Sequence, residues 1–256
     1  MNIGEEELKQ AIIETLANWG LSAHPVPTAA VKTPDLRATA SDQHYAIEIK
    51  QRQSDRHSKD VFANLQPEES ASLAPLGIAR DTASQSLTRS AVRQLRGEAP
   101  STFRLLWVLC EGFDADTDEE QAKASLLGSQ IVWCRRPDGK VYWCYFFGES
   151  DFWRYRADID GAFVATLRDS VANILLLLNP YSPRYESLKV STLVQNLGPD
   201  SVLDVPSDEA AGACLWADFE VDRRETSMVL NLLNKKYGTD LVVMPVHRYA
   251  VVVRAQ

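Results

Sequence analysis

Apolar residues recur every three or four positions in several stretches, as they do along the buried face of an amphipathic helix. The first stretch opens with three glutamates, whose charge is favourable near a helix N-terminus. Glycine, which commonly ends helices, follows two of the stretches, at Gly20 and Gly97. The helices predicted along the chain cover residues 5–19, 59–65, 81–96, 165–178 and 224–237.

Strand patterns lie between these helices. Residues 34–40 and 43–51 flank Ser41-Asp42, and the second segment alternates apolar with polar residues as a half-buried strand does. Residues 103–110 form an apolar run that is typical of a strand covered on both faces. Further strands are predicted at 130–136, 141–147, 214–221, 241–246 and 249–254, with one short strand within 22–33 and an acidic loop at 111–120. The order of elements predicts an α/β (α+β) fold, a mixed β-sheet flanked by helices.

Charge and hydropathy narrow the class of protein. The chain has 27 Lys and Arg against 35 Asp and Glu, a net charge of −8, which argues against coating nucleic acid through bulk charge. A local basic groove remains compatible with this balance, because net charge does not give the distribution of charges. No apolar run approaches the roughly 20 residues of a membrane span, and the N-terminus lacks a signal-peptide pattern. We therefore expect a soluble, cytoplasmic protein with no membrane contact.

The four cysteines show no metal-ligand spacing, which predicts reduced thiols and no structural zinc. Cys134 and Cys144 flank a predicted hairpin turn at Asp138-Gly139. A two-residue turn there pairs Cys134 with Trp143 and places Cys144 on the opposite face of the hairpin. A disulfide between the two cysteines is therefore not expected.

The segment with candidate chemistry is the strand pair around Ser41-Asp42. If these two residues form the turn, paired positions sum to 83, so Asp35 lies directly opposite Glu48. Two facing carboxylates repel each other, and a divalent cation such as Mg²⁺, which binds one or two carboxylates and keeps waters, relieves the repulsion. Lys50 projects from the same face as Glu48, beside the water that would attack a phosphodiester. The pattern predicts metal-dependent phosphodiester hydrolysis.

This segment resembles the PD-(D/E)xK nuclease superfamily, which has the restriction-endonuclease-like fold. Pro34-Asp35 corresponds to the PD element and Glu48-Ile49-Lys50 to the (D/E)xK element. The resemblance covers about residues 5–110 and implies a four-stranded mixed sheet flanked by helices, with Asp35, Glu48 and Lys50 as the catalytic set. It implies Asp35, Glu48 and the backbone carbonyl of Ile49 as ligands of Mg²⁺, for which Mn²⁺ can substitute.

Members of this superfamily often add an acid from the first helix and a polar residue from the helix after the (D/E)xK strand. The acid is expected to be Glu14 or Glu7, which share one side of the first helix; the alternative is a solvated glutamate. The polar residues expected to bind nucleic acid are Arg52 on the strand and Gln85, Arg89 and Arg93 on the following helix. The alternative for the helix residues is an ordinary exposed basic face.

The predicted organisation is a nuclease-like core domain at 1–150 and a C-terminal α+β extension or subdomain at 151–256. The first functional hypothesis is a Mg²⁺-dependent endonuclease or exonuclease acting on DNA, in restriction or antiviral defence or repair, with a helicase, an ATPase or another partner protein. A homo-oligomer is compatible with the sequence. The alternative is a catalytically inactive module of the same fold that binds nucleic acid or assembles a complex, and a third possibility is an unrelated α+β class.

Overall fold

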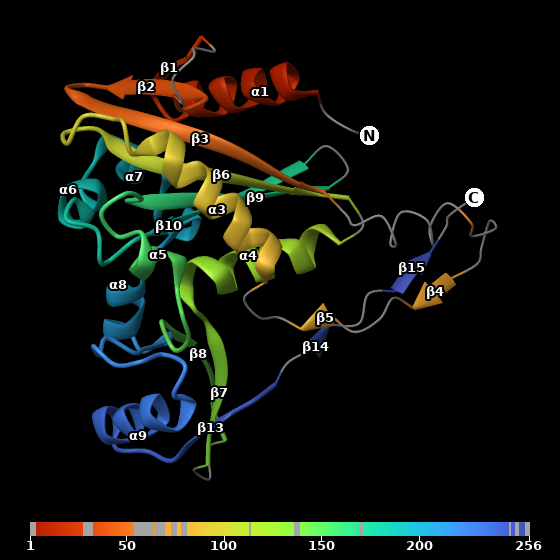
Figure 1. Ribbon diagram of the computed structural model, residues 1–256, viewed down its shortest axis with the longest axis vertical. Coiled ribbons are helices and arrows are strands. Elements are labelled where there is room, and N and C mark those ends of the chain that lie inside the picture. The colour runs from red at the N-terminus through yellow and green to blue at the C-terminus, as the bar shows by residue number, and fades with distance from the viewer. Residues whose placement is uncertain are drawn as a thin grey trace.

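A computed structural model of the chain describes residues 4–27, 33–53, 64, 70–72, 76–77, 81–112, 114–135, 139–168, 171–245, 247–248 and 251–253. Its centre is a seven-stranded mixed sheet with the order β1-β2-β3-β6-β9-β10-β11 (Figure 1). β3 pairs parallel with β6, β6 parallel with β9, and β10 parallel with β11, whereas the other neighbours are antiparallel. The strands are β1 (Ser22–Pro25), β2 (Leu36–Ala40), β3 (Gln43–Gln53), β6 (Phe103–Glu111), β9 (Gly161–Arg168), β10 (Val171–Leu178) and β11 (Val202–Leu203). This sheet confirms the predicted fold class.

Helices cover the sheet on both faces and divide its core into two apolar layers. One layer packs side chains of α1, α6 and α7 against the sheet, and the other packs α3, α4, α5 and α8 against the opposite face. The helices are α1 (Glu5–Asn18), α3 (Thr82–Leu95), α4 (Ala115–Leu127), α5 (Asp151–Arg154), α6 (Tyr185–Lys189), α7 (Thr192–Leu197) and α8 (Val205–Ala210), and a 3₁₀ turn spans Pro199–Ser201. The alternation of β3 matches this division, because Tyr45 and Ile47 face the α1 layer and Ala46 faces the α3 layer.

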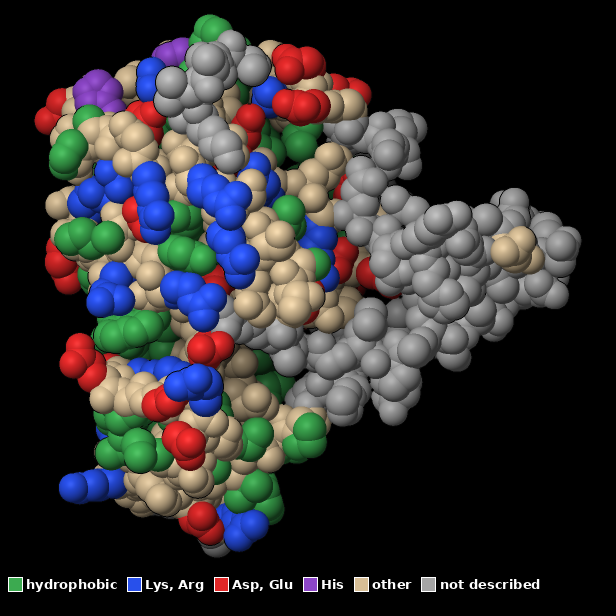
Figure 2. All heavy atoms as spheres, viewed as in Figure 1, with side chains coloured by type: hydrophobic (Ala, Val, Ile, Leu, Met, Phe, Trp, Pro, Cys, Tyr) green, Lys and Arg blue, Asp and Glu red, His purple; other side chains and the backbone are tan. Residues whose placement is uncertain are grey.

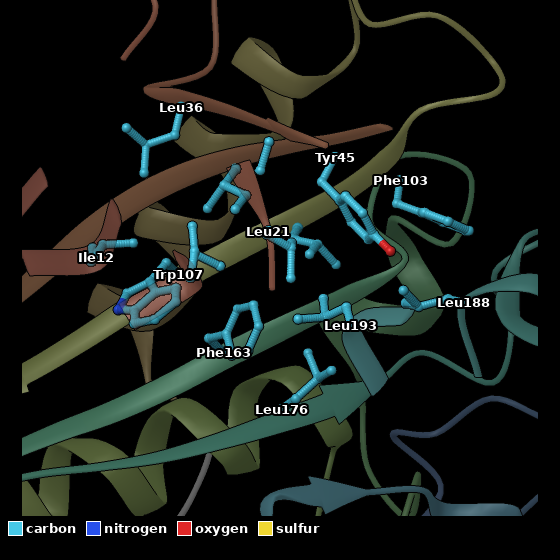
Figure 3. Packing of buried hydrophobic residues seen from close by; sticks show 14 of the residues in the cluster. Ile12, Leu21, Leu36, Tyr45, Phe103, Trp107, Phe163, Leu176, Leu188 and Leu193 are labelled. Carbon is cyan, nitrogen blue, oxygen red and sulfur yellow. The ribbon is translucent and has the colours of Figure 1, made fainter. Parts of the chain in front are cut away.

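An aromatic group joins α1 to the middle of the sheet. Phe163 on β9 is fully buried, with its ring centroid 4.6 Å from that of Trp107 on β6 and 5.5 Å from that of Trp19 at the end of α1. Figure 3 shows Trp107 and Phe163 side by side, between Ile12 of α1 and Leu176 of β10. Such stacked pairs add to the stabilisation from burial alone, so this group fixes the position of α1 on the sheet.

A second, smaller sheet has the order β12-β8-β7-β13 and is covered by α9 (Thr226–Tyr237). Val229 and Leu233 of α9 pack into its buried cluster. Two short antiparallel pairs, β5 with β14 and β4 with β15, bring the end of the chain to the segment that follows β3. The strands of the small sheet are β7 (Gln130–Cys134), β8 (Val141–Tyr145), β12 (Leu215–Trp216) and β13 (Leu241–Val243). The strands of the two short pairs are β4 (Ser70–Ser72), β5 (Leu76–Gly77), β14 (His247–Arg248) and β15 (Val251–Val253).

The helix predicted at 165–178 is wrong. β9 and β10 occupy this region as antiparallel strands, with Gly161 opposite Leu178 and Ala165 opposite Ile174. Leu177 is buried in one apolar layer and Leu176 in the other. A continuous apolar run has the same appearance in a buried strand as in a buried helix, so its periodicity cannot distinguish the two.

The loop predicted at 111–120 is also wrong, because α4 begins at Ala115 and Gly128 ends it in a left-handed conformation. The hairpin register differs as well: Trp143 pairs with Ile131, not with Cys134, and the amide of Cys134 donates to the carbonyl of Lys140. The turn is thus longer than two residues. The strand predicted at 214–221 is limited to β12, and the helix predicted at 59–65 lies outside the described residues except at Asn64.

The central sheet takes β9, β10 and β11 from beyond position 150, so strands on both sides of the expected boundary share one sheet. The division of the chain into domains at 150 stays a prediction. All four cysteines are buried and free, as expected. In the part of the chain that the structure describes, no helix has both the length and the apolar character to cross a bilayer.

Phe163→Ala tests the aromatic group. We expect the free energy of unfolding to fall by about 3–5 kcal/mol, because the substitution removes a buried ring and leaves a cavity between Trp19 and Trp107. Urea titration followed by circular dichroism measures the loss. Phe163→Leu keeps most of the volume and should cost less than half as much; equal losses for both variants would show that the buried volume at this position contributes little.

Candidate active site

The β2–β3 hairpin sets the positions of the candidate residues. Leu36 pairs with Ile47 and Ala40 with Gln43, so paired positions sum to 83, as predicted. Ser41 begins the turn with a φ of 54°. Asp35 immediately precedes β2, and extending the register by one residue brings it opposite Glu48. The hairpin therefore places two carboxylates opposite each other, one just before β2 and the other within β3.

Asp35 has one oxygen fixed by the backbone of β3. Its Oδ2 accepts a hydrogen bond from the amide of Ile49, at 2.8 Å. Its Oδ1 lies 3.7 Å from Nζ of Lys9, which reaches it from α1. The carboxylate is held on two sides, and about a fifth of the side chain remains exposed.

Glu48 is fully buried, and only one of its two carboxylate oxygens has a hydrogen-bond donor among the described residues. Its Oε1 accepts a hydrogen bond from Lys50, whereas Oε2 is buried without a hydrogen-bond partner among the described residues. Burial, and to a smaller extent the neighbouring Asp35, raise the pKa of Glu48 to about 7 against the opposing effect of Lys50. A buried acceptor without a donor is costly and calls for a cation or a proton.

Lys50 lies between the acid pair and α3. Besides Glu48 it reaches Oε1 of Gln94 at 3.4 Å, and the amide of Gln94 donates to the carbonyl of Thr33 at 3.4 Å. Gln94 thus links Lys50 to the segment that precedes Asp35. From the sequence, Gln85, Arg89 and Arg93 were the candidates on this helix. Gln94 could not be identified from the sequence, because its contact with Lys50 depends on how α3 crosses β3.

The donor set fits a magnesium ion. In the described residues, no group of three or more His, Cys, Asp and Glu side chains converges to hold a metal. Mg²⁺ does not need such a cage, because one or two carboxylates suffice when waters complete its octahedron. Asp35 and Glu48 meet that requirement, and the orphaned Oε2 of Glu48 is an acceptor that such an ion would satisfy. Ile49, whose carbonyl is the third predicted ligand, lies between Glu48 and Lys50 on β3.

The structure places a different α1 acid near the site from those expected. Glu7 and Glu14 are both exposed, and Glu14 accepts a hydrogen bond from its neighbour Gln10 at 2.9 Å. Glu5 is the acid whose pKa is lowered, by its hydrogen bond to Lys9 first and also by the charge of Lys50. The first turns of α1 contact the acid pair through Lys9, which also pairs with Glu5, and metal ligation by Glu7 or Glu14 stays an untested prediction.

Arg52 belongs to an internal network. Its guanidinium contacts Asp81 and Asp118, each at 2.6 Å, and donates to Ser84 and to Gln121. The network joins β3 to α3 and α4. Four protein contacts of a mostly buried guanidinium make a structural role a better account of Arg52 than contact with a DNA phosphate.

The three residues expected on α3 differ in exposure. Arg89 and Arg93 are exposed, whereas Gln85 is partly buried. No ion pair of Arg89 or Arg93 is found among the described residues. Figure 2 shows Lys and Arg side chains gathered across the middle of the visible face, where Figure 1 places α3 and α5.

Comparison with known proteins gives one distant likeness. No protein-family model matches the sequence, and no curated protein matches it. A solved structure of Hjc, a Holliday junction resolvase from the archaeal hyperthermophile Archaeoglobus fulgidus, is 18% identical with a TM-score of 0.22. The match covers 40% of this chain, and this chain spans 66% of the resolvase. The assignment of the fold rests on the sheet and its two helical layers.

Because the pKa of Glu48 is raised in the folded protein, we expect the free energy of unfolding to depend on pH through this residue. A folded-state pKa of about 7, against 4.5 in the unfolded chain, means that the folded protein binds this proton more tightly, so the contribution of Glu48 to stability falls as pH rises from about 4.5 to 7. Glu48→Gln has no such dependence. We expect its free energy of unfolding, relative to wild type, to increase by up to about 3 kcal/mol between pH 5 and pH 8.

Urea titrations at the two pH values measure this difference. Glu14→Gln, which changes an exposed glutamate, is the control and should differ from wild type equally at both. If the free energy of unfolding of Glu48→Gln differs from that of wild type by the same amount at both pH values, the raised pKa of Glu48 is contradicted.

Proposed function

We propose that this protein is a metal-dependent nuclease of the PD-(D/E)xK type that hydrolyses phosphodiester bonds of DNA. Asp35 and Glu48 would hold Mg²⁺, or Mn²⁺ in its place, and Lys50 would stand beside the attacking water. The observation that carries the proposal is the placement of two carboxylates opposite each other, one of them buried with an unpaired oxygen, next to a lysine.

The residues of the site have separable tasks in such a reaction. Hydrolysis adds one water to phosphorus, breaks the bond to the leaving oxygen and gives that oxygen a proton. A bound Mg²⁺ supplies the Lewis acid that stabilises negative charge on the phosphate oxygens. Lys50 can donate a hydrogen bond to the water or to a phosphate oxygen, and Gln94 limits the positions that its ammonium group can take.

The distribution of charge supports an approach of nucleic acid across α3. Arg89 and Arg93 are one helical turn apart, and α3 also carries Gln94, which contacts Lys50. Part of the acidic charge lies elsewhere, on α4, where Glu119 and Glu120 pair with Lys123. The net charge of −8 favours delivery of the substrate by a partner protein, such as a helicase or ATPase of a repair or defence system.

The catalytic assignment is tested by Asp35→Ala and Lys50→Ala. Each should lower the rate of Mg²⁺-dependent cleavage of plasmid and linear DNA by at least about a hundredfold, because each removes a group that acts on the reacting atoms. Asp42→Ala, in the turn of the same hairpin, is the matched control and should cleave like wild type. Thermal melting establishes that the variants are folded.

Equal rates for wild type and both variants would reject the residue assignment. If wild type cleaves neither single- nor double-stranded DNA nor RNA with Mg²⁺ or Mn²⁺, the nuclease proposal fails, and a non-catalytic nucleic-acid-binding or assembly module becomes the better account of the fold.

The proposed DNA surface is tested by Arg89→Ala/Arg93→Ala. If both arginines neutralise phosphates, binding of duplex DNA should weaken at low salt, and the slope of log K against log[salt] should become less negative by about 2. Fluorescence anisotropy over a salt series measures the slope. Arg135→Ala, on the exposed end of the small sheet, is the control; an unchanged slope in the double variant would place the DNA elsewhere.

A further inference from the structure

Lys9 is mostly buried although both of its partners on the same helix lie in solvent. Its Nζ lies 2.7 Å from Glu5 and 3.5 Å from Glu6. The side chains of these glutamates are 77% and 88% exposed, whereas that of Lys9 is 15% exposed. Pairs at this spacing usually lie on the helix surface, with both side chains in water. Glu5 and Glu6 therefore do not account for the burial of Lys9, which must be covered by residues of other elements.

The third partner of Lys9 is Asp35, one of the two facing acids. The Nζ–Oδ1 distance of 3.7 Å directs the charge of Lys9 to the carboxylate oxygen that the amide of Ile49 does not hold. Lys50 is paired in the same way with Glu48. The two lysines reach the acids from opposite helical layers, Lys50 on the side of α3 and Lys9 from α1.

Each carboxylate of the pair thus has an ammonium group nearby, and Asp35 shares that of Lys9 with Glu5 and Glu6. A divalent cation added to Asp35 and Glu48 would meet two positive charges within a few ångströms, in a place where burial weakens solvent screening. The two ammonium groups therefore weaken its binding, and an anion that offsets their charge should strengthen it. A phosphodiester supplies that negative charge. Lys9 donates one hydrogen bond, to Glu5, and its contact with Asp35 is an ion pair at 3.7 Å, so its ammonium group has N–H groups left to donate to a phosphate oxygen.

We propose that Lys9 is a second substrate-binding cation of the site, which makes the binding of metal and of the DNA phosphate cooperative. Without substrate it neutralises Asp35; with substrate it donates a hydrogen bond to the phosphodiester and keeps its proton throughout. This inference rests on the proposed nuclease function for the identity of the anion.

The chain contains a close control for Lys9. Lys123 on α4 also pairs with the glutamates three and four residues before it, Glu120 at 2.8 Å and Glu119 at 3.0 Å, and its side chain is 18% exposed. It differs in that it has no recorded contact with Asp35 or Glu48 among the described residues. Lys9→Met and Lys123→Met therefore remove the same charge from similar helix surroundings, and only the first changes the acid pair.

The experiment measures Ca²⁺ binding to the full chain by isothermal titration calorimetry, with and without a short DNA duplex. Ca²⁺ takes oxygen ligands as Mg²⁺ does, and a gel after each titration confirms that the duplex is intact. We expect Lys9→Met to bind Ca²⁺ without DNA roughly tenfold more tightly than wild type, because a positive charge next to Asp35 is gone. The gain in Ca²⁺ affinity on adding DNA should shrink by a similar factor. Lys9→Arg and Lys123→Met should behave like wild type.

The proposal is overturned if Lys9→Met and Lys123→Met have the same Ca²⁺ affinity, if Lys9→Met binds no Ca²⁺, or if the gain with DNA is unchanged. Cleavage by wild type is a separate readout. Tighter Ca²⁺ binding by Lys9→Met in a protein that cleaves no nucleic acid would reject the proposed function but keep the coupling between Lys9 and the cation.

Discussion

The constraint on which the candidate site depends is the antiparallel register of β2 and β3. Once Ala40 pairs with Gln43, every earlier pair is fixed, and Asp35 is brought to Glu48 whatever the energetic cost of two neighbouring negative charges. The structure relieves this repulsion with two lysines and a backbone amide instead of separating the acids. A pair kept together in this way is more readily explained by a ligand that needs both acids than by a contribution to stability.

Burial makes the same pair chemically responsive. Glu48 lies on β3, an interior strand of the sheet, and its second oxygen is buried with no hydrogen-bond partner among the described residues. Its raised pKa means that a proton and the ammonium group of Lys50 compete for one carboxylate near neutral pH. Perturbed acids of this kind concentrate at functional sites, although structural ion pairs produce them too. Arg52 and Asp118 are an example of the second case: the pKa of Asp118 is raised to about 6 by burial, against the opposing effect of Arg52.

The two helices that reach the site, α1 and α3, are each anchored to the sheet at some distance from the acids. The aromatic group of Trp19, Trp107 and Phe163 fixes the end of α1 on one face of the sheet, and the first turns of the same helix carry Lys9 to Asp35. On the other face, the Arg52 network ties β3 to α3 and α4, and α3 brings Gln94 to Lys50. Both helices that reach the acids are therefore anchored away from them, which leaves the charged side chains as the adaptable part of the site.

The sequence by itself determined the hairpin, its register and the identity of the two facing acids. These are local features, set by a two-residue turn and by the period of two along a strand. The mixed sheet was predicted from the order of helices and strands along the chain. It could not determine that residues 165–178 form strands or that 115–127 form a helix. The first is an apolar run whose conformation depends on what covers it, and the second is an acidic segment stabilised by Arg52 and Lys123. Only the tertiary structure decided that Lys9 and Gln94 reach the acid pair and its lysine, and that Arg52 pairs with Asp81 and Asp118 instead. Such contacts depend on how separate helices cross the sheet. The spacing of residues along the sequence does not contain that information.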